Sequence, residues 1–207
     1  MKKLIVILIL FFVTSSFCLA QERYHNCGMQ GNAKKNNVKA LNRLKNRYNN
    51  PNSSDFNTRV SLSSLLQTSD DTERFTTDKA VTIEGYVFKV KAGGKETCNC
   101  TTAVDRYKDI HIELVADYNH AGENDRVVVE VTPRLKRQIF NQLGIASITT
   151  RNLKNAIEGR TIRVKGWLFF DEEHTENAYN TNPDNVENNW RATCWELHPV
   201  TSIEIIE

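Results

Sequence analysis

The segment DIHIEL at residues 109–114 alternates polar and aliphatic side chains without a break. Alternate side chains of a β-strand point to opposite faces, so Asp109, His111 and Glu113 would share one face of the strand. Imidazole and carboxylate groups arranged in such a row are suited to binding a divalent metal ion or to catalysis. The same row also fits the solvated face of a half-buried strand, stabilised by cross-strand ion pairs.

Two later segments carry groups of the same kind. RVVVEVT would place Glu130 on the polar face of its strand, and WELH would place Glu196 and His198 outward, with its Trp and Leu inward. We therefore predict one outward-facing patch, and within it a metal site made by His111, Glu113, Glu196 and His198. No cofactor is expected, with zinc or another divalent metal ion as the alternative. The predicted ligand-binding residues are Asp109, His111, Glu113, Glu130, Glu196, His198, Arg106 and Lys108.

The elements that must position these residues follow from the pattern of the chain. Between the third and fourth expected strands, residues 134–158 change to helical spacing, with Gly144 and Gly159 as the expected helix ends. The order of three strands, a helical crossover and two more strands predicts a mainly β fold, a five-stranded OB-like barrel. In such a barrel strand two lies beside strand three, and strand three lies beside strand five. Gly85 and Gly166 interrupt two of the strands, where a barrel bends or bulges. The expected strands are 81–90, 109–117, 126–132, 159–170 and 190–206.

Two of these strands also resemble a known family. VTIEGYVFKV and GRTIRVKGWLFF are similar to the first and fourth strands of bacterial OB-fold domains of the nucleic-acid-binding-like superfamily. The phrases LNRLKNR and WELHPVTSIE resemble exported bacterial proteins that carry such a domain, and no established activity comes with that likeness. The resemblance covers about residues 80–207. It implies a binding surface for oligonucleotides, oligosaccharides or proteins on strands two and three, and it does not imply a ligand.

The first twenty residues have the pattern of a secretory signal peptide. Lys2 and Lys3 precede the apolar run LIVILILFFV, and CLAQ supplies a cleavage site after Ala20. We predict a periplasmic or secreted protein, the alternative being a lipoprotein modified at Cys18. Removing residues 1–20 leaves 25 basic and 25 acidic residues. This balance, and the lack of aromatic platforms on the polar face, argue against nucleic acid as a partner.

Residues 21–79 are expected to form a basic N-terminal helix and a polar connector that precede the barrel domain, residues 80–207. Within 33–48, Val38, Leu41, Leu44 and Tyr48 recur three or four apart, which predicts one amphipathic helix. Residues 21–60 carry eight basic and two acidic groups, so the segment either docks on the acidic barrel or contacts an anionic surface.

Four cysteines remain after cleavage, and an even number in an exported chain predicts two disulfides. A bridge between Cys98 and Cys100 would close a very small ring, so Cys27 and Cys194 are each expected to take one of that pair. The pairing itself stays open. Thiolate metal ligation by Cys98 and Cys100 is the alternative.

The sequence as a whole predicts an exported, non-enzymatic binding module. Its expected surface is the face of strands two, three and five with the loops 91–108 and 171–189. The ligand would be an extracytoplasmic glycan, a protein or a small anionic group reached through Arg106 and Lys108. One alternative is a metal-dependent hydrolase on the same face, with His174 closing over it. The other is contact of the N-terminal helix with an anionic surface or nucleic acid.

Overall fold

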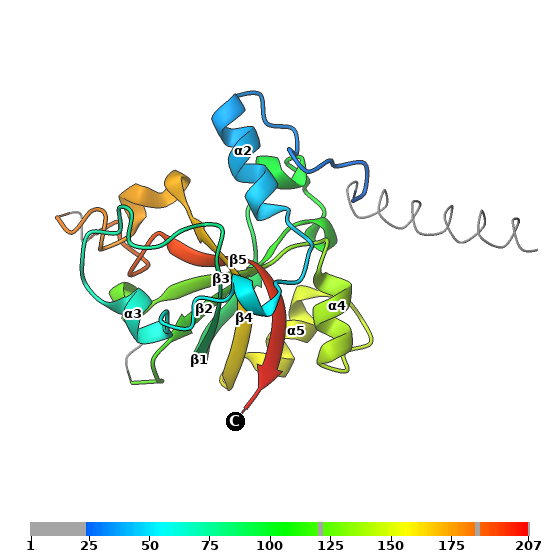
Figure 1. Ribbon diagram of the computed structural model, residues 1–207. Helices are drawn as coiled ribbons and strands as arrows, with labels where there is room; N and C mark the ends of the chain where they lie inside the picture. Colours follow the sequence, from blue (N-terminus) through cyan, green and yellow to red (C-terminus); the bar gives the residue numbers. More distant parts are fainter. Residues whose placement is uncertain (1–23, 120–121, 185–186, 207) are drawn as a thin grey trace, which may run out of the picture.

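A closed barrel with the strand order β1-β2-β3-β5-β4 forms the centre of the structure, a computed structural model (Figure 1). The structure describes residues 24–119, 122–184 and 187–206, so the predicted signal peptide, residues 1–20, lies outside the described residues together with Cys18. The strands are β1 (Ala80–Ala92), β2 (Ile110–Val115), β3 (Val127–Val131), β4 (Thr161–Phe170) and β5 (Trp195–Ile205). The α-helices are α2 (Asn36–Lys45), α3 (Leu62–Leu66), α4 (Lys136–Gln142) and α5 (Thr150–Ile157). Short 3-10 helices are η1 (Ser53–Asp55), η2 (Thr97–Asn99), η3 (Asp105–Tyr107), η4 (Glu123–Asp125) and η5 (Glu172–Asn177).

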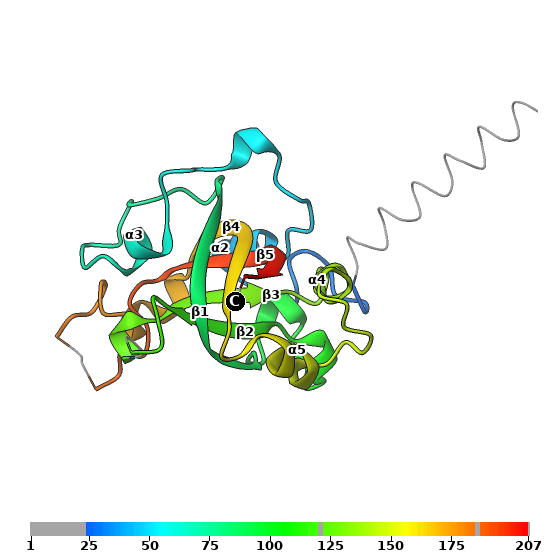
Figure 2. The ribbon, with the colours of Figure 1, turned by 90° about the horizontal axis from the view of Figure 1, so that it is seen from below.

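The barrel confirms the predicted architecture and strand order. Strand β2 pairs with β3, and β3 pairs with β5 in parallel, with Val129 opposite Leu197. The crossover between β3 and β4 consists of the short helices α4 and α5, which lie together on one side of the barrel, while α3 lies on the other side (Figure 2). Their apolar residues Ile139, Phe140 and Leu153 are fully buried in the barrel core.

Two sequence-based expectations about strands need correction. The irregularity of β1 lies between Val87 and Lys89, whereas Gly85 pairs in regular register with Ile162. A Cβ atom on Gly85 would come within 2.7 Å of the Leu62 side chain, so this glycine makes room for α3. The fifth strand begins at Trp195 and not at residue 190, because the residues before it belong to the covering loop.

The segment expected to be a polar connector contributes to the core. Leu65 of α3 is fully buried and packs in the same apolar cluster as the barrel strands. Ser61 caps α3 by accepting a hydrogen bond from the backbone N–H of Ser64, with the reciprocal bond also present. Among the described residues, no helix is both long and apolar enough to cross a membrane.

Candidate functional site

The polar faces of β2, β3 and β5 are buried, which corrects the prediction of an outward, solvated patch. All six side chains of β2 are buried, as are those of β3. Exposure of the predicted patch residues does not exceed 6%, and His198 is fully buried. The physical reason is a cover of three segments: α2, the loop after β1, and the segment 171–194 between β4 and β5. The patch residues are Asp109, His111, Glu113, Glu130, Glu196 and His198.

The histidines and glutamates of this face form a continuous chain of contacts. His111 lies directly opposite Glu130 in the β2–β3 register, and its Nδ1 is 2.9 Å from Glu130 Oε1. His198 Nδ1 lies 3.3 Å from Glu130 Oε2 and 3.1 Å from Glu196 Oε1. His111 Nε2 is 3.3 Å from Glu113 Oε1. The register of three strands therefore brings five of the predicted residues together.

The charged groups in this series of contacts shift one another's pKa values. Burial opposes ionisation of Glu130, but the hydrogen bond from His111 and the positive charge of His198 lower its pKa to about 2. Burial likewise disfavours the charged form of His198, but the hydrogen bond to Glu196 and the charge of Glu130 raise its pKa to about 9. Both groups are thus held in their charged forms at neutral pH.

Asp109 is the exception in this cluster. Burial raises its pKa to about 7, with His198 acting in the opposite direction. Its Oδ2 accepts a hydrogen bond of 2.5 Å from the Asn99 side chain and lies 3.8 Å from Cys98 Sγ. Its Oδ1 is buried without a hydrogen-bond partner, and so is Nε2 of His198. Such atoms are rare in folded proteins because an unsatisfied buried polar group costs free energy.

Arg191 extends the network on the side of the covering loop. It is one of the largest fully buried side chains, with its guanidinium 3.1 Å from both Asp171 Oδ2 and Glu196 Oε2. His174 Nδ1 lies 2.7 Å from Asp171 Oδ2. Burial works against ionisation of Asp171, but the hydrogen bond from His174 and the charge of Arg191 hold its pKa well below the usual range.

Helix α2 contributes Lys45 to the same face. Its Nζ lies 2.7 Å from Glu96 Oε2 and 5.4 Å from the centre of the Phe169 ring. Burial disfavours the ammonium form, but the negative charges of Glu96 and Asp171 raise its pKa well above the usual value. The helix is shorter than the predicted 33–48, and its buried face is polar: Asn42, Lys45 and Asn46.

A cleft of about 320 Å³ opens above this network. Trp190 forms part of its wall and is half-buried, with its ring 5.6 Å from that of His111 and 5.9 Å from that of His174. Lys91 and Arg191 lie against the same ring, at 5.2 and 5.4 Å from its centre. The other lining residues are Lys45, Ala92, Gly93, Gly94, Lys95, Glu96, Val128, Glu130, Asp171 and Glu196.

Two predicted ligand-binding residues lie elsewhere. Lys108 forms an ion pair of 2.8 Å with Asp105, and Arg106 lies over the ring of Tyr107. Neither residue is among the described residues that line the cleft. An anionic ligand held by this pair and the patch together is therefore not supported.

The cysteines follow the prediction only in part. Cys27 and Cys100 form a disulfide, which ties the N-terminal segment to the loop after β1 as expected. Cys98 and Cys194 are free and buried, so the expected second bridge is wrong. Each has its own surroundings: Cys194 lies 3.4 Å from Thr181 Oγ1, whereas Cys98 lies near Glu96 and Asp109.

Sequence reasoning missed several members of this site. Asp171 lies in the loop 171–189, which was expected to border the surface, and Trp190 lies at the expected start of the fifth strand. No local pattern marks either residue as a direct partner of the patch. Lys45 did leave a signal, because Asn42, Lys45 and Asn46 recur at helical spacing and form a polar face next to the apolar stripe.

Comparison with known proteins gives little beyond this geometry. No protein-family model matches the chain, and no curated protein matches it. Among solved structures, asparaginyl-tRNA synthetase of Entamoeba histolytica with asparaginyl-adenylate is 14% identical with a TM-score of 0.32, over 66% of this chain and 23% of that one. Yeast Stn1 and Ten1 is 14% identical with a TM-score of 0.29, over 62% and 43%. The match thus spans less than half of either structure, and scores this low carry no argument about function.

Proposed function

We propose that this protein is a non-enzymatic binding module that takes a neutral, hydroxyl-rich ligand, such as a glycan, in the cleft above β2, β3 and β5. The observation that carries the proposal is the half-buried ring of Trp190 in a cleft where most of the charged side chains are already paired, the exposed Lys95 excepted. An aromatic ring with polar groups around it offers an apolar face to a sugar ring and hydrogen bonds to its hydroxyls.

The balance of charges favours a neutral ligand over an anionic one. Four cations and four carboxylates line the cleft. Among them, Lys45 pairs with Glu96, and Arg191 pairs with both Asp171 and Glu196. A phosphate-binding groove requires unpaired positive charge along the nucleic-acid backbone. Paired groups still offer hydrogen bonds, which suits hydroxyls. The volume is at the lower end of the range of about 300–1,000 Å³ for ligand pockets.

The proposed place of action is outside the cytoplasm. The Cys27–Cys100 disulfide is compatible with an oxidising compartment, and the predicted signal peptide supports the same location. An extracytoplasmic glycan is therefore the partner that we propose. The alternative is contact of residues 33–48 with an anionic surface. Among the cations of this segment only Lys45 is buried, so the exposed Lys34, Lys35 and Arg43 are available for such a contact.

The test is a screen against neutral and acidic oligosaccharides, followed by calorimetric titration of the best ligand. Trp190→Ala is expected to weaken binding by roughly 30-fold, the loss typical of a central aromatic contact. Tyr118→Ala is the matched control, because Tyr118 is 69% exposed and does not line the cleft. Binding of neutral sugars should change little between low and high salt. Salt-sensitive binding of single-stranded DNA, with no sugar bound, would contradict the proposal.

A further inference from the structure

The structure contains a group of oxygen and nitrogen ligands beneath the cleft that is independent of the glycan proposal. Asp109 immediately precedes β2, Glu130 belongs to β3 and His198 belongs to β5. Each offers one ligand atom, and these atoms all lie within 4.8 Å of one another. Their exposures are 1%, 6% and 0%, so the group is enclosed by protein.

Two atoms of this group are without hydrogen-bond partners. Oδ1 of Asp109 and Nε2 of His198 are buried and unsatisfied, although every other heteroatom of these two side chains has a polar neighbour. Nδ1 of His198 lies 3.1 Å from Glu196 Oε1. A histidine that ligates a metal has the same arrangement, with one ring nitrogen held by a carboxylate and the other coordinating once the metal ion has displaced its proton.

Asp109 also stands out by its charge. The neighbouring Glu130 and Glu196 have oppositely charged partners within 3.3 Å, whereas Asp109 has no ion pair among the described residues. Its polar contacts are the amide of Asn99 and the thiol of Cys98. A buried carboxylate without an ion-pair partner is unfavourable, and a bound cation would supply such a partner.

We propose that Asp109, Glu130 and His198 form a buried binding site for one divalent transition-metal ion, with zinc as the best fit to two carboxylates and an imidazole. Zinc bonds to such ligands are about 2.0–2.2 Å long, so the three side chains would draw together on binding. Three protein ligands leave a fourth position for water or a ligand. Glu130 also lines the cleft, which gives the ion a route to the site.

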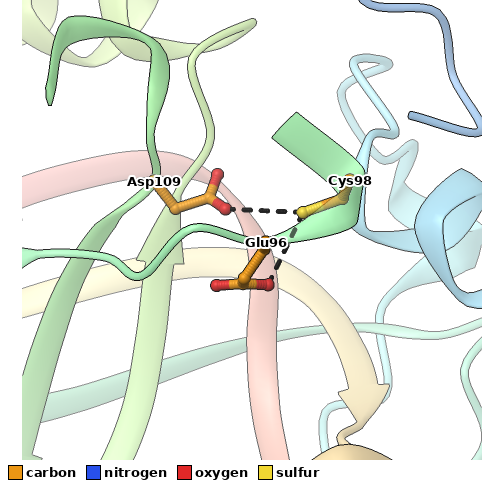
Figure 3. A group of neighbouring side chains, drawn as sticks. All are labelled: Glu96, Cys98 and Asp109. Carbon is orange, nitrogen blue, oxygen red and sulfur yellow. Dashed lines mark hydrogen bonds between the residues drawn. The ribbon is translucent and has the colours of Figure 1, made fainter. Parts of the chain in front are cut away.

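A second group shares Asp109 and provides the competing assignment. Figure 3 shows hydrogen bonds that join Cys98 to both Glu96 and Asp109. Its Sγ lies 3.5 Å from Glu96 Oε2 and 3.8 Å from Asp109 Oδ2. This group is the weaker candidate because Glu96 is already paired with Lys45 at 2.7 Å. A neighbouring thiol nevertheless makes zinc a better probe than a hard ion such as magnesium.

The experiment is titration of the chelator-treated protein with zinc alone, by calorimetry and by elemental analysis after dialysis. We expect about one equivalent bound at micromolar zinc. Asp109→Asn and His198→Gln should each weaken binding by roughly 100-fold or more, since even partners of metal ligands account for about 10–100-fold. His174→Gln is the control: this histidine lines the cleft but lies outside the group, so zinc binding should be unchanged.

A measurement on the wild-type protein guards against variants that do not fold. Cobalt(II) bound by oxygen and nitrogen ligands should give visible d–d bands without a thiolate charge-transfer band, and Cys98→Ser should leave the spectrum unchanged. The proposal is overturned if the wild-type protein retains no zinc, or if folded Asp109→Asn and His198→Gln bind zinc as well as the wild type does. A thiolate band that disappears in Cys98→Ser would also overturn it, by assigning the ion to Glu96, Cys98 and Asp109. Sugar binding by the metal-free protein would leave the glycan proposal standing in each of these cases.

Discussion

Replacing Lys45 by methionine tests whether α2 docks on the barrel through its polar face. The Lys45 ammonium is 2.7 Å from Glu96 Oε2, which corresponds to a gross Coulomb attraction of about 6 kcal/mol at an effective dielectric constant of 20. Desolvation of the two charges offsets much of this attraction. Removing one partner of a buried pair nevertheless costs about 3–5 kcal/mol, because the remaining charge is left uncompensated. The Glu96 side chain is 23% exposed and can be partly hydrated, so we expect a loss of about 3 kcal/mol.

The assay is urea denaturation at pH 7, with Lys35→Met as the control. Lys35 is exposed and sits at the N-terminal cap of α2, so its replacement should change the free energy of unfolding by no more than about 0.5 kcal/mol. In a double-mutant cycle, the double variant Lys45→Met/Glu96→Gln should lose less free energy of unfolding than the two single variants lose together. Equal, small effects of Lys45→Met and Lys35→Met would refute the docking of α2 through this face.

Three further predictions concern stability and the cysteines. The pKa of Glu113 is about 2, because hydrogen bonds from His111 and Lys91 outweigh the effect of burial. The ionised Glu113 therefore contributes its full stabilisation of the folded state above its unfolded pKa near 4.5, and this contribution is lost as the pH falls toward 2. The stability difference between wild type and Glu113→Gln should therefore be about 1.4 kcal/mol smaller at pH 3.5 than at pH 7 in urea titrations. Gly31→Ala should lower the free energy of unfolding by more than about 1 kcal/mol, because the Gly31 backbone has φ +59° and a Cβ would lie 1.8 Å from the Thr97 carbonyl oxygen. Gly94→Ala is the control and should be neutral in the same assay, because a Cβ there meets nothing within 4 Å. Alkylation of an unreduced, denatured chain beginning at Gln21 should modify Cys98 and Cys194 only, and peptide mass spectrometry would detect any other pattern.

The architecture of the barrel was predictable because local hydrophobic periodicities indicate each of its strands and helices. Alternation in DIHIEL and the helical spacing of RLKRQIFNQLG each describe one element, and a barrel follows from their order along the chain. The strand neighbours were predicted correctly for the same reason. Ends of elements were less accurate, since β5 begins at Trp195 and α2 ends at Lys45, where tertiary contacts rather than patterns decide.

Burial of the polar face could not be read from the same pattern. Strict alternation is typical of a strand with one wet face, yet His111 and Glu113 are covered by segments that are distant in the sequence. The cover depends on Lys45 and Arg191, whose partners Glu96 and Glu196 are identified only by packing. The missing second disulfide has the same origin, because the sequence does not reveal the separate surroundings of Cys98 and Cys194.

Because the polar face of β2, β3 and β5 is covered, each charged side chain on it needs a partner. A buried polar strand face is stable only if its charges are paired, and His111, Glu130 and Arg191 obey this rule with contacts of 2.9–3.1 Å. Against such a background, the departures are informative, because folded proteins keep unsatisfied groups mainly where function requires them. Asp109, His111 and His198 hold unsatisfied atoms on this face, and two of these residues, Asp109 and His198, lie in one group with Glu130. The polar row DIHIEL is therefore most informative at its first residue, Asp109, which forms no ion pair in the part of the chain that the structure describes.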